Sequence, residues 1–301
     1  MRKFDVNVNN TSEAEAFILE CEERFSRELD EAIEDVLSHD VKIITLSGPT
    51  CSGKTTTASR LVERINASGH KAVVLSIDDF YKNRDENERN NTGTKAPDYD
   101  SVDSIDLDYL REFSRSLLAG ETVQIPHYSF REGIRDRYDE YIPEDRDIYI
   151  FEGIQAVYPE VTELFGEDYK SIFISVAEDV SCRGVELSRN EIRLLRRIVR
   201  DNQFRNATAE FTLFLWDGVR ENEEKNIFPN ATACDVYINS FLAYELFIID
   251  NHARELLLSV PENSIHRADA DELFAKLSVF DNPYFEDRMI PDNSVFREFI
   301  G

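Results

Sequence analysis

One segment of eight residues constrains the fold of this chain more than any other feature. Gly48-Pro49-Thr50-Cys51-Ser52-Gly53-Lys54-Thr55 carries glycine at its first and sixth positions, followed by lysine and threonine. It follows the mostly apolar run 41–47 and precedes a stretch with helical periodicity. A strand, a glycine-rich turn and a helix in this order bring backbone N–H groups and the positive end of a helix together. The segment therefore predicts a site for the phosphate chain of a nucleotide.

The residue types in this phosphate loop fit the binding of a triphosphate. Lys54 is expected to reach the β- and γ-phosphates, and the Thr55 hydroxyl to help hold Mg²⁺. Cys51 is expected to be a tolerated small side chain whose backbone makes the contact, and a redox-sensitive thiol is the alternative. We therefore expect ATP and Mg²⁺ as cofactors, with ATP bound by Gly48, Pro49, Thr50, Cys51, Ser52, Gly53, Lys54, Thr55 and Thr56.

The apolar runs around the loop predict the fold class. Strands are expected at 41–47, 71–77, 121–126, 147–151 and 171–176, and helices at 55–67, 107–118, 188–202, 208–222, 241–254 and 269–279. Alternation of strands and helices from 41 to 180 favours a parallel sheet with helices on both faces. We therefore expect an α/β fold of the P-loop NTPase type, with a helical lid at about residues 182–230 and further C-terminal helices.

A long amphipathic helix is expected before the first strand, over 12–38. Ser12 and Glu15 have the spacing of a capping box, and apolar residues then recur at helical intervals. Its expected role is packing against the main domain or against a sister subunit. We therefore divide the chain into an N-terminal helical extension, 1–40, and a main domain, 41–301.

Composition narrows the choice of partners. The formal net charge of −26 argues against a general nucleic-acid binder, and much of this acidity is expected on a solvated surface. The four cysteines are widely spaced, which disfavours a disulfide framework and a structural zinc site. The N-terminus lacks the apolar run of a signal peptide, and no apolar stretch reaches membrane-spanning length. We expect a cytoplasmic protein without membrane partners; a homo-oligomer is compatible with the sequence.

Two carboxylates and a run of arginines distinguish a kinase from other nucleotide-binding proteins. Asp78 and Glu152 each follow an apolar strand, so both are expected at the carboxyl edge of the sheet, beside the phosphates. Six arginines fall between 189 and 205 of a very acidic chain. Each feature alone is as compatible with a helix cap or a solvated helix face. With the phosphate loop they compose a phosphoryl-transfer site of base, metal carboxylate and cationic lid.

These segments together resemble the uridine kinase and phosphoribulokinase family. The resemblance rests on the phosphate loop with SIDDFY (76–81), IPHYSF (125–130), FEGIQA (151–156) and RLLRRIVRD (193–201). It is closest to a bacterial subgroup of uridine kinase-like nucleoside kinases, which VRENEEKNIFP (219–229), ACDVYINSFLAYEL (233–246) and IPDNSVFREFIG (290–301) also match. The resemblance covers about residues 41–301 and implies a P-loop kinase domain there. Members of this subgroup often carry an N-terminal region similar to that of threonyl-tRNA synthetase. Because only about 40 residues precede the first strand, we expect that region to be absent here.

The resemblance also implies residue roles. Asp78 is the expected general base, beside an Asp79 that stands where the family usually has serine. Tyr81, Asp100, Tyr128, Phe130 and Arg193 are the expected acceptor-binding residues, although two aromatics at that spacing are as often plain core. Lys54, Arg196, Arg197 and Arg200 are the expected phosphate contacts in catalysis, and Thr55, Glu152 and Asp78 are the expected metal site.

One departure from the family pattern bears on the acceptor. Pyrimidine nucleoside kinases typically carry a base-reading histidine where this chain has Gly133, and His127 is expected to face away from Tyr128. Losing a polar reader relaxes discrimination between bases. Three hypotheses follow: a nucleoside kinase that makes a 5′-monophosphate, a kinase for another acceptor such as a sugar phosphate or a pantothenate-like alcohol, and a nucleotide-binding regulatory protein without transfer activity. The acidic stretch 98–108 argues against a phosphorylated acceptor.

Overall fold

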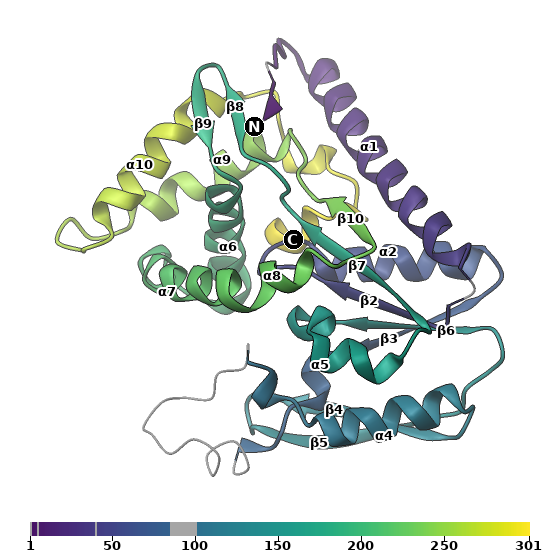
Figure 1. Ribbon diagram of the computed structural model, residues 1–301. Coiled ribbons are helices and arrows are strands. Elements are labelled where there is room, and N and C mark those ends of the chain that lie inside the picture. Colours follow the sequence, from purple (N-terminus) through teal and green to yellow (C-terminus); the bar gives the residue numbers. More distant parts are fainter. Residues whose placement is uncertain (1, 5, 40, 85–100) are drawn as a thin grey trace.

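The centre of the molecule is a five-stranded sheet in the order β10-β7-β2-β6-β3, and every strand pair in it is parallel. The computed structural model describes residues 2–4, 6–39, 41–84 and 101–301. Helices cover both faces of the sheet (Figure 1). The predicted α/β fold with a parallel sheet is therefore confirmed.

The strands are Arg2–Lys3 (β1), Ile43–Ser47 (β2), Lys71–Ser76 (β3), Val123–Ser129 (β4), Ile134–Tyr141 (β5), Asp147–Glu152 (β6), Tyr169–Ser175 (β7), Val180–Cys182 (β8), Val185–Leu187 (β9) and Val236–Asn239 (β10). The helices are Thr11–Leu37 (α1), Lys54–Ala67 (α2), Leu107–Leu118 (α4), Pro159–Thr162 (α5), Arg189–Arg205 (α6), Ala209–Asn222 (α7), Phe228–Ala231 (α8), Glu245–Leu258 (α9), Arg267–Leu277 (α10) and Arg297–Ile300 (α11). None of the helices within these described ranges has the length and apolar character needed to cross a membrane.

The two faces of the sheet bury different kinds of side chain. Successive residues of a strand point to opposite faces. On β6 and β7 the aliphatic positions Ile148, Ile150, Ile172 and Ile174 join the core shared with α1, α2, α6 and α9. Their neighbours Tyr149, Phe151 and Phe173 join the core shared with α4 and α5. The central strands are buried on both faces, as expected for a parallel sheet covered by helices.

Helix α1 begins two residues before the predicted capping box would start it. Its cap is Asn10, whose side chain accepts a hydrogen bond from the Glu13 backbone N–H. Ile18, Phe25 and Leu29 of α1 lie in the same apolar core as α2 and the sheet. Helix α1 therefore packs as part of the main core. The domain boundary at residue 40 remains a prediction from the sequence.

A second, smaller sheet lies away from the central one. The predicted strand at 121–126 is β4, which pairs antiparallel with β5 in a hairpin instead of joining the parallel sheet. The hairpin lies beside α4 below the central sheet (Figure 1). The hairpin brings Tyr128 to the turn that follows β3, where the Tyr128 N–H donates to Asp79 Oδ1 at 2.8 Å.

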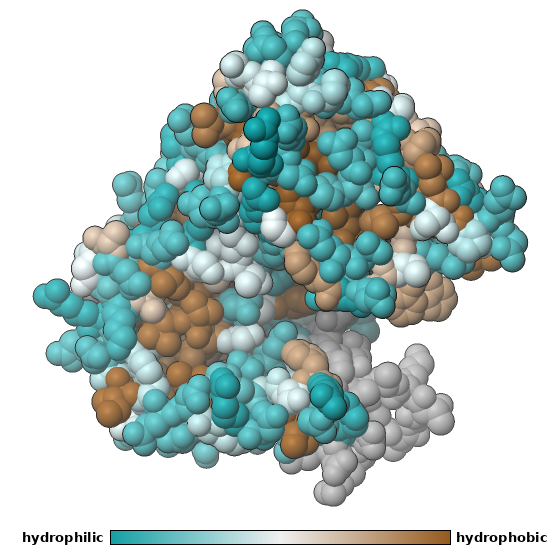
Figure 2. Space-filling model, turned by 180° about the vertical axis from the view of Figure 1, so that it is seen from behind, coloured by the Kyte–Doolittle hydropathy of each residue, from teal (hydrophilic) through white to brown (hydrophobic). Residues whose placement is uncertain are grey.

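The face of the molecule that is turned away in Figure 1 is mostly hydrophilic, with hydrophobic residues gathered in separate patches (Figure 2).

Candidate active site

The backbone of the phosphate loop requires its two glycines. A Cβ on Gly48 would lie 2.1 Å from the Ile174 carbonyl oxygen, so no side chain fits there. Gly53 has φ +93°, a left-handed conformation that favours glycine, and Cys51 has φ +56°. The loop runs directly from β2 into α2, whose first residue is Lys54. The local sequence thus produces the strand, tight loop and helix start that an anion site needs.

Lys54 folds back over this loop. Its Nζ donates hydrogen bonds to the Gly48 carbonyl at 2.8 Å and the Pro49 carbonyl at 3.2 Å. Burial lowers the pKa of Lys54, and the nearby carboxylates of Glu152, Glu298 and Asp78 oppose that shift. An ammonium group held among carboxylates beside a glycine-rich loop is placed to meet phosphate oxygens.

Asp78 and Glu152 lie at the carboxyl edge of neighbouring strands. The β3–β6 register pairs Ser76 with Glu152, and Ser76 Oγ donates to Glu152 Oε1 at 3.1 Å. Asp78 follows in a short 3-10 turn, Ile77–Phe80. Burial raises the pKa of both carboxyls, and the charge of Lys54 works against that rise. The structure therefore brings together the lysine, the expected base and the expected metal carboxylate.

Three aromatic rings form a cluster that reaches Asp78 through Tyr81. Tyr81, Tyr128 and Phe130 pack edge to face, with ring centroids 5.3 to 6.0 Å apart. The Tyr81 hydroxyl donates to Asp78 Oδ1, while Phe130 is 54% exposed. His127 bonds Asp139 through Nε2 at 2.7 Å. The rings form a partly open apolar wall beside a carboxylate, which suits a flat hydroxylated ligand.

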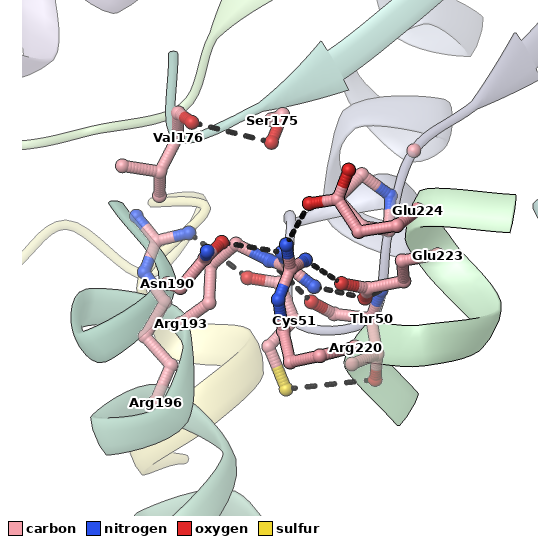
Figure 3. Close-up of polar contacts among 12 residues, drawn as sticks. Thr50, Cys51, Ser175, Val176, Asn190, Arg193, Arg196, Arg220, Glu223 and Glu224 are labelled. Atoms are coloured by element: carbon pink, nitrogen blue, oxygen red, sulfur yellow. Dashed lines mark hydrogen bonds and ion pairs between the residues drawn. The ribbon is translucent and has the colours of Figure 1, made fainter. Parts of the chain in front are cut away.

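Arg193 and Arg196 reach from helix α6 to the Thr50 and Cys51 part of the phosphate loop (Figure 3). Arg193 Nε donates to the Thr50 carbonyl at 3.0 Å, and Arg196 to the Cys51 carbonyl at 3.1 Å. Arg193 is also paired with Glu223, and Arg196 with Glu245. Their exposed fractions are 1% and 0%. The sequence predicts Arg193 at the acceptor and Arg196 on the phosphates. In the structure both guanidinium groups are buried and bonded to the loop backbone and to carboxylates.

Arg197 and Arg200 lie further along α6. Both bond Asp201, Arg197 Nε at 3.2 Å and Arg200 Nε at 2.9 Å. Neither contact involves the phosphate loop, so their expected phosphate contacts stay predictions. Asp100, expected to hold ribose hydroxyls, falls outside the described residues.

Three of the oxygen donors expected to hold Mg²⁺ lie among the described residues near the phosphate loop. No group of three or more His, Cys, Asp or Glu side chains among the described residues is arranged to hold a metal ion by itself. Mg²⁺, however, is usually held by one or two carboxylates together with substrate phosphates and water. Glu152, Asp78 and the exposed Thr55 next to Lys54 fit that mode, because they are hard oxygen donors gathered at the loop.

Two carboxylates without a role predicted from the sequence also contact the phosphate loop and the start of α2. Glu223 Oε1 accepts a hydrogen bond from the Thr50 N–H at 3.2 Å, and Glu298 Oε2 accepts one from the Thr56 N–H at 3.2 Å. Both lie in late segments, 219–229 and 290–301, that matched the family without an assigned function. That match is the one sequence signal that could have drawn attention to them.

Comparison with known proteins identifies the family. The model of the phosphoribulokinase / uridine kinase family matches residues 43–245, which is more than half of the chain. The chain belongs to this family. Members of this class are phosphotransferases that act on hydroxyl groups, and the phosphate loop, Asp78 and Glu152 all lie within the matched residues.

Individual relatives agree with this assignment. The chain is 33% identical to a uridine kinase of Schizosaccharomyces pombe over 155 residues, which is 50% of this chain and 32% of that protein. It is 26% identical to a uridine kinase of Halobacterium salinarum over 196 residues, covering 65% of this chain and 78% of that one. A possible uridine kinase from Bacillus stearothermophilus has a solved structure with 17% identity and a TM-score of 0.47, covering 71% of this chain and 99% of that chain. That structural similarity is too low to bear on function.

Proposed function

We propose that this protein is an ATP- and Mg²⁺-dependent kinase that transfers the γ-phosphate to a hydroxyl of a small molecule, with the 5′-hydroxyl of a nucleoside as the favoured acceptor. The observation that carries the proposal is the position of Asp78. It lies between Lys54 of the phosphate loop, whose charge acts on it, and the aromatic ring of Tyr81, whose hydroxyl bonds it. Family membership supports the same reaction class.

The proposed reaction assigns one proton transfer to Asp78. The acceptor O–H proton passes to the Asp78 carboxylate as the oxygen forms a bond to the γ-phosphorus and the bond to ADP breaks. Bound Mg²⁺ would neutralise charge on the phosphates, held by Glu152, Thr55 and Asp78. Lys54 would exchange its Gly48 and Pro49 contacts for phosphate oxygens.

Arg193 and Arg196 are proposed as positioning residues. By holding the Thr50 and Cys51 carbonyls they fix the peptide planes of the loop. Those planes also carry the N–H groups that would point at phosphate. Arg197 and Arg200 remain the proposed phosphate contacts of the lid, about residues 182–230 of a kinase domain at 41–301. A cytoplasmic location is part of the same proposal.

The proposal of a nucleoside acceptor rests on the aromatic cluster of Tyr81, Tyr128 and Phe130 and on the similarity to uridine kinases. Tyr128 and Phe130 offer faces and edges to a flat base. At Gly133 the nearest side chain is that of Arg84, whose Nε lies 2.7 Å from where a Cβ would stand. An arginine only donates hydrogen bonds, so it would favour an acceptor that presents an oxygen at this point. A uridine- or cytidine-like base presents such an oxygen, and so does a sugar phosphate, which is the second candidate.

The decisive test is acceptor-dependent release of ADP from ATP with Mg²⁺ present. A panel of uridine, cytidine, adenosine, simple sugars, sugar phosphates and pantothenate separates the hypotheses. We expect turnover with a nucleoside and a 5′-monophosphate as product. Turnover with a sugar phosphate alone would make a sugar phosphate the acceptor in place of a nucleoside. If no compound on the panel stimulated ADP release, a regulatory nucleotide-binding protein would be favoured.

A further inference from the structure

The C-terminal segment 290–301 packs directly on the phosphate loop. Val295 lies against Gly53, where a Cβ would come within 2.2 Å of Val295 Cγ2. Val295, Phe296 and Phe299 are fully buried in the main core. Arg297 ties the segment further by donating to the Ile290 carbonyl at 2.7 Å. The segment is therefore a fixed wall of the loop, held by apolar packing.

This wall presents one carboxylate to the start of α2. Glu298 Oε2 accepts hydrogen bonds from the Thr56 N–H at 3.2 Å and the Thr56 hydroxyl at 3.3 Å. Thr56 is the third residue of α2, so its N–H has no acceptor within the helix and faces whatever anion lies at the helix start. The charge of Glu298 also acts on Lys54 and Arg200, two cations of the site. Glu298 thus occupies donors that a nucleotide phosphate needs.

Glu223, the carboxylate at the other end of the loop, differs from Glu298 because it has ion-pair partners. Glu223 accepts from the Thr50 N–H, but Arg193 and Arg220 both pair with it, which neutralises its charge. Within the described part of the chain, Glu298 has no ion-pair partner of that kind. A half-buried carboxylate without a paired cation repels an incoming phosphate more strongly than a paired one does.

We propose that Glu298 is a built-in anion that competes with nucleotide phosphate for the Thr56 donors and so sets the affinity of the site for nucleotides. This inference rests on the proposed function, since it needs the loop to bind phosphate. A carboxylate that only capped α2 would stabilise the helix and leave nucleotide affinity unchanged. The two roles therefore give different results in a binding experiment.

The test compares the full-length protein with Glu298→Gln and with the control Glu286→Gln. The control removes the same unit of charge from a carboxylate that pairs with Arg288 near the C-terminal segment. Dissociation constants for ADP and for inorganic tripolyphosphate are measured by titration calorimetry, with thermal unfolding as a check of folding. We expect Glu298→Gln to bind both ligands about 10-fold more tightly, because a repulsive charge is removed from the phosphate site. The control should stay within about twofold of the wild type.

Two results decide against the inference. Unchanged or weaker binding of both ligands by folded Glu298→Gln would assign the residue to capping alone. Wild-type protein that binds neither ligand would remove the phosphate site itself, and the inference with it. If Glu298→Gln does not fold, Glu298→Asp replaces it, because it withdraws the carboxylate by one methylene. A gain of several-fold is then expected, and no gain counts against the proposal.

Discussion

The Tyr81 hydroxyl donates a hydrogen bond to Asp78 Oδ1 across 3.0 Å and accepts one from Gln155 Nε2 across 2.9 Å. These two hydrogen bonds fix the orientation of the Asp78 carboxylate. Burial raises the pKa of that carboxylate. A base held in one orientation beside the phosphate loop loses little entropy when the acceptor arrives.

Asp78→Asn is expected to lower kcat by at least about 100-fold and to leave ATP affinity nearly unchanged, because an amide accepts no proton from the acceptor hydroxyl. Steady-state kinetics and nucleotide titration measure the two effects. The matched control is Asp79→Asn, since Asp79 is adjacent and accepts instead from the Tyr128 N–H at 2.8 Å. A variant at Asp78 that turned over like the wild type would remove this residue from the mechanism.

Tyr81→Phe is expected to shift the acid limb of the kcat/KM profile to higher pH. Burial raises the pKa of Asp78, and the hydrogen bond from Tyr81 opposes that rise, so removing the hydroxyl raises the pKa further. A general base acts when ionised, so activity is present above this pKa and is lost as pH falls through it. The control is Tyr109→Phe, whose hydroxyl bonds the Gln124 carbonyl. An acid limb that stayed in place would show that Asp78 does not control it.

Gly53→Ala is expected to weaken nucleotide binding by at least about 10-fold. The φ of +93° strains any residue with a Cβ, and Val295 fills the space that the methyl group would need. Gly218→Ala is the matched control, because it lies exposed in helix α7 with nothing within 4 Å of its added Cβ. That change is expected to stabilise the protein by about 0.5–1 kcal/mol. Equal effects of the two substitutions on ADP affinity would argue against a strained loop.

Arg196→Gln is expected to lower the free energy of unfolding by about 3 kcal/mol. The substitution leaves the buried Glu245 without its partner, and burial already raises the pKa of Glu245 to about 7. It also frees the Cys51 carbonyl, so weaker nucleotide binding should accompany the loss. Arg205→Gln, which removes an exposed arginine near Asp201, is expected to change stability by less than about 0.5 kcal/mol. Chemical denaturation of both variants measures the difference.

The elements and site residues that depend on local sequence patterns could be predicted. Helix α4 has the predicted bounds, 107–118, because an aspartate cap and a regular apolar stripe define it. The loop with Lys54, Asp78 and Glu152 was recognised because each residue follows an apolar strand. Strand β5 was missed, since its sequence IRDRYDEY is mostly charged and has little apolar face to bury.

Contacts between segments that are distant in the sequence could not be predicted from local sequence patterns. Glu298 meets Thr56 across 242 residues of chain, and Glu223 meets Thr50 across 173. Neither pairing follows from periodicity or motif spacing. The buried placement of Arg193 and Arg196 has the same origin, because acids on other helices decide which arginines of α6 turn inward. An arginine-rich helix predicts positive charge without telling which side chains are already paired.

The contact of Val295 with Gly53 ties the phosphate loop to the C-terminal segment 290–301. It joins two segments separated by most of the polypeptide, and such long-range closures come at a high entropic cost and form slowly. A fragment cut to residues 43–245 would keep every residue of the phosphate loop and lose the Val295 side chain that packs against it. A truncated variant intended to keep the phosphate loop intact should therefore retain the C-terminal segment 290–301.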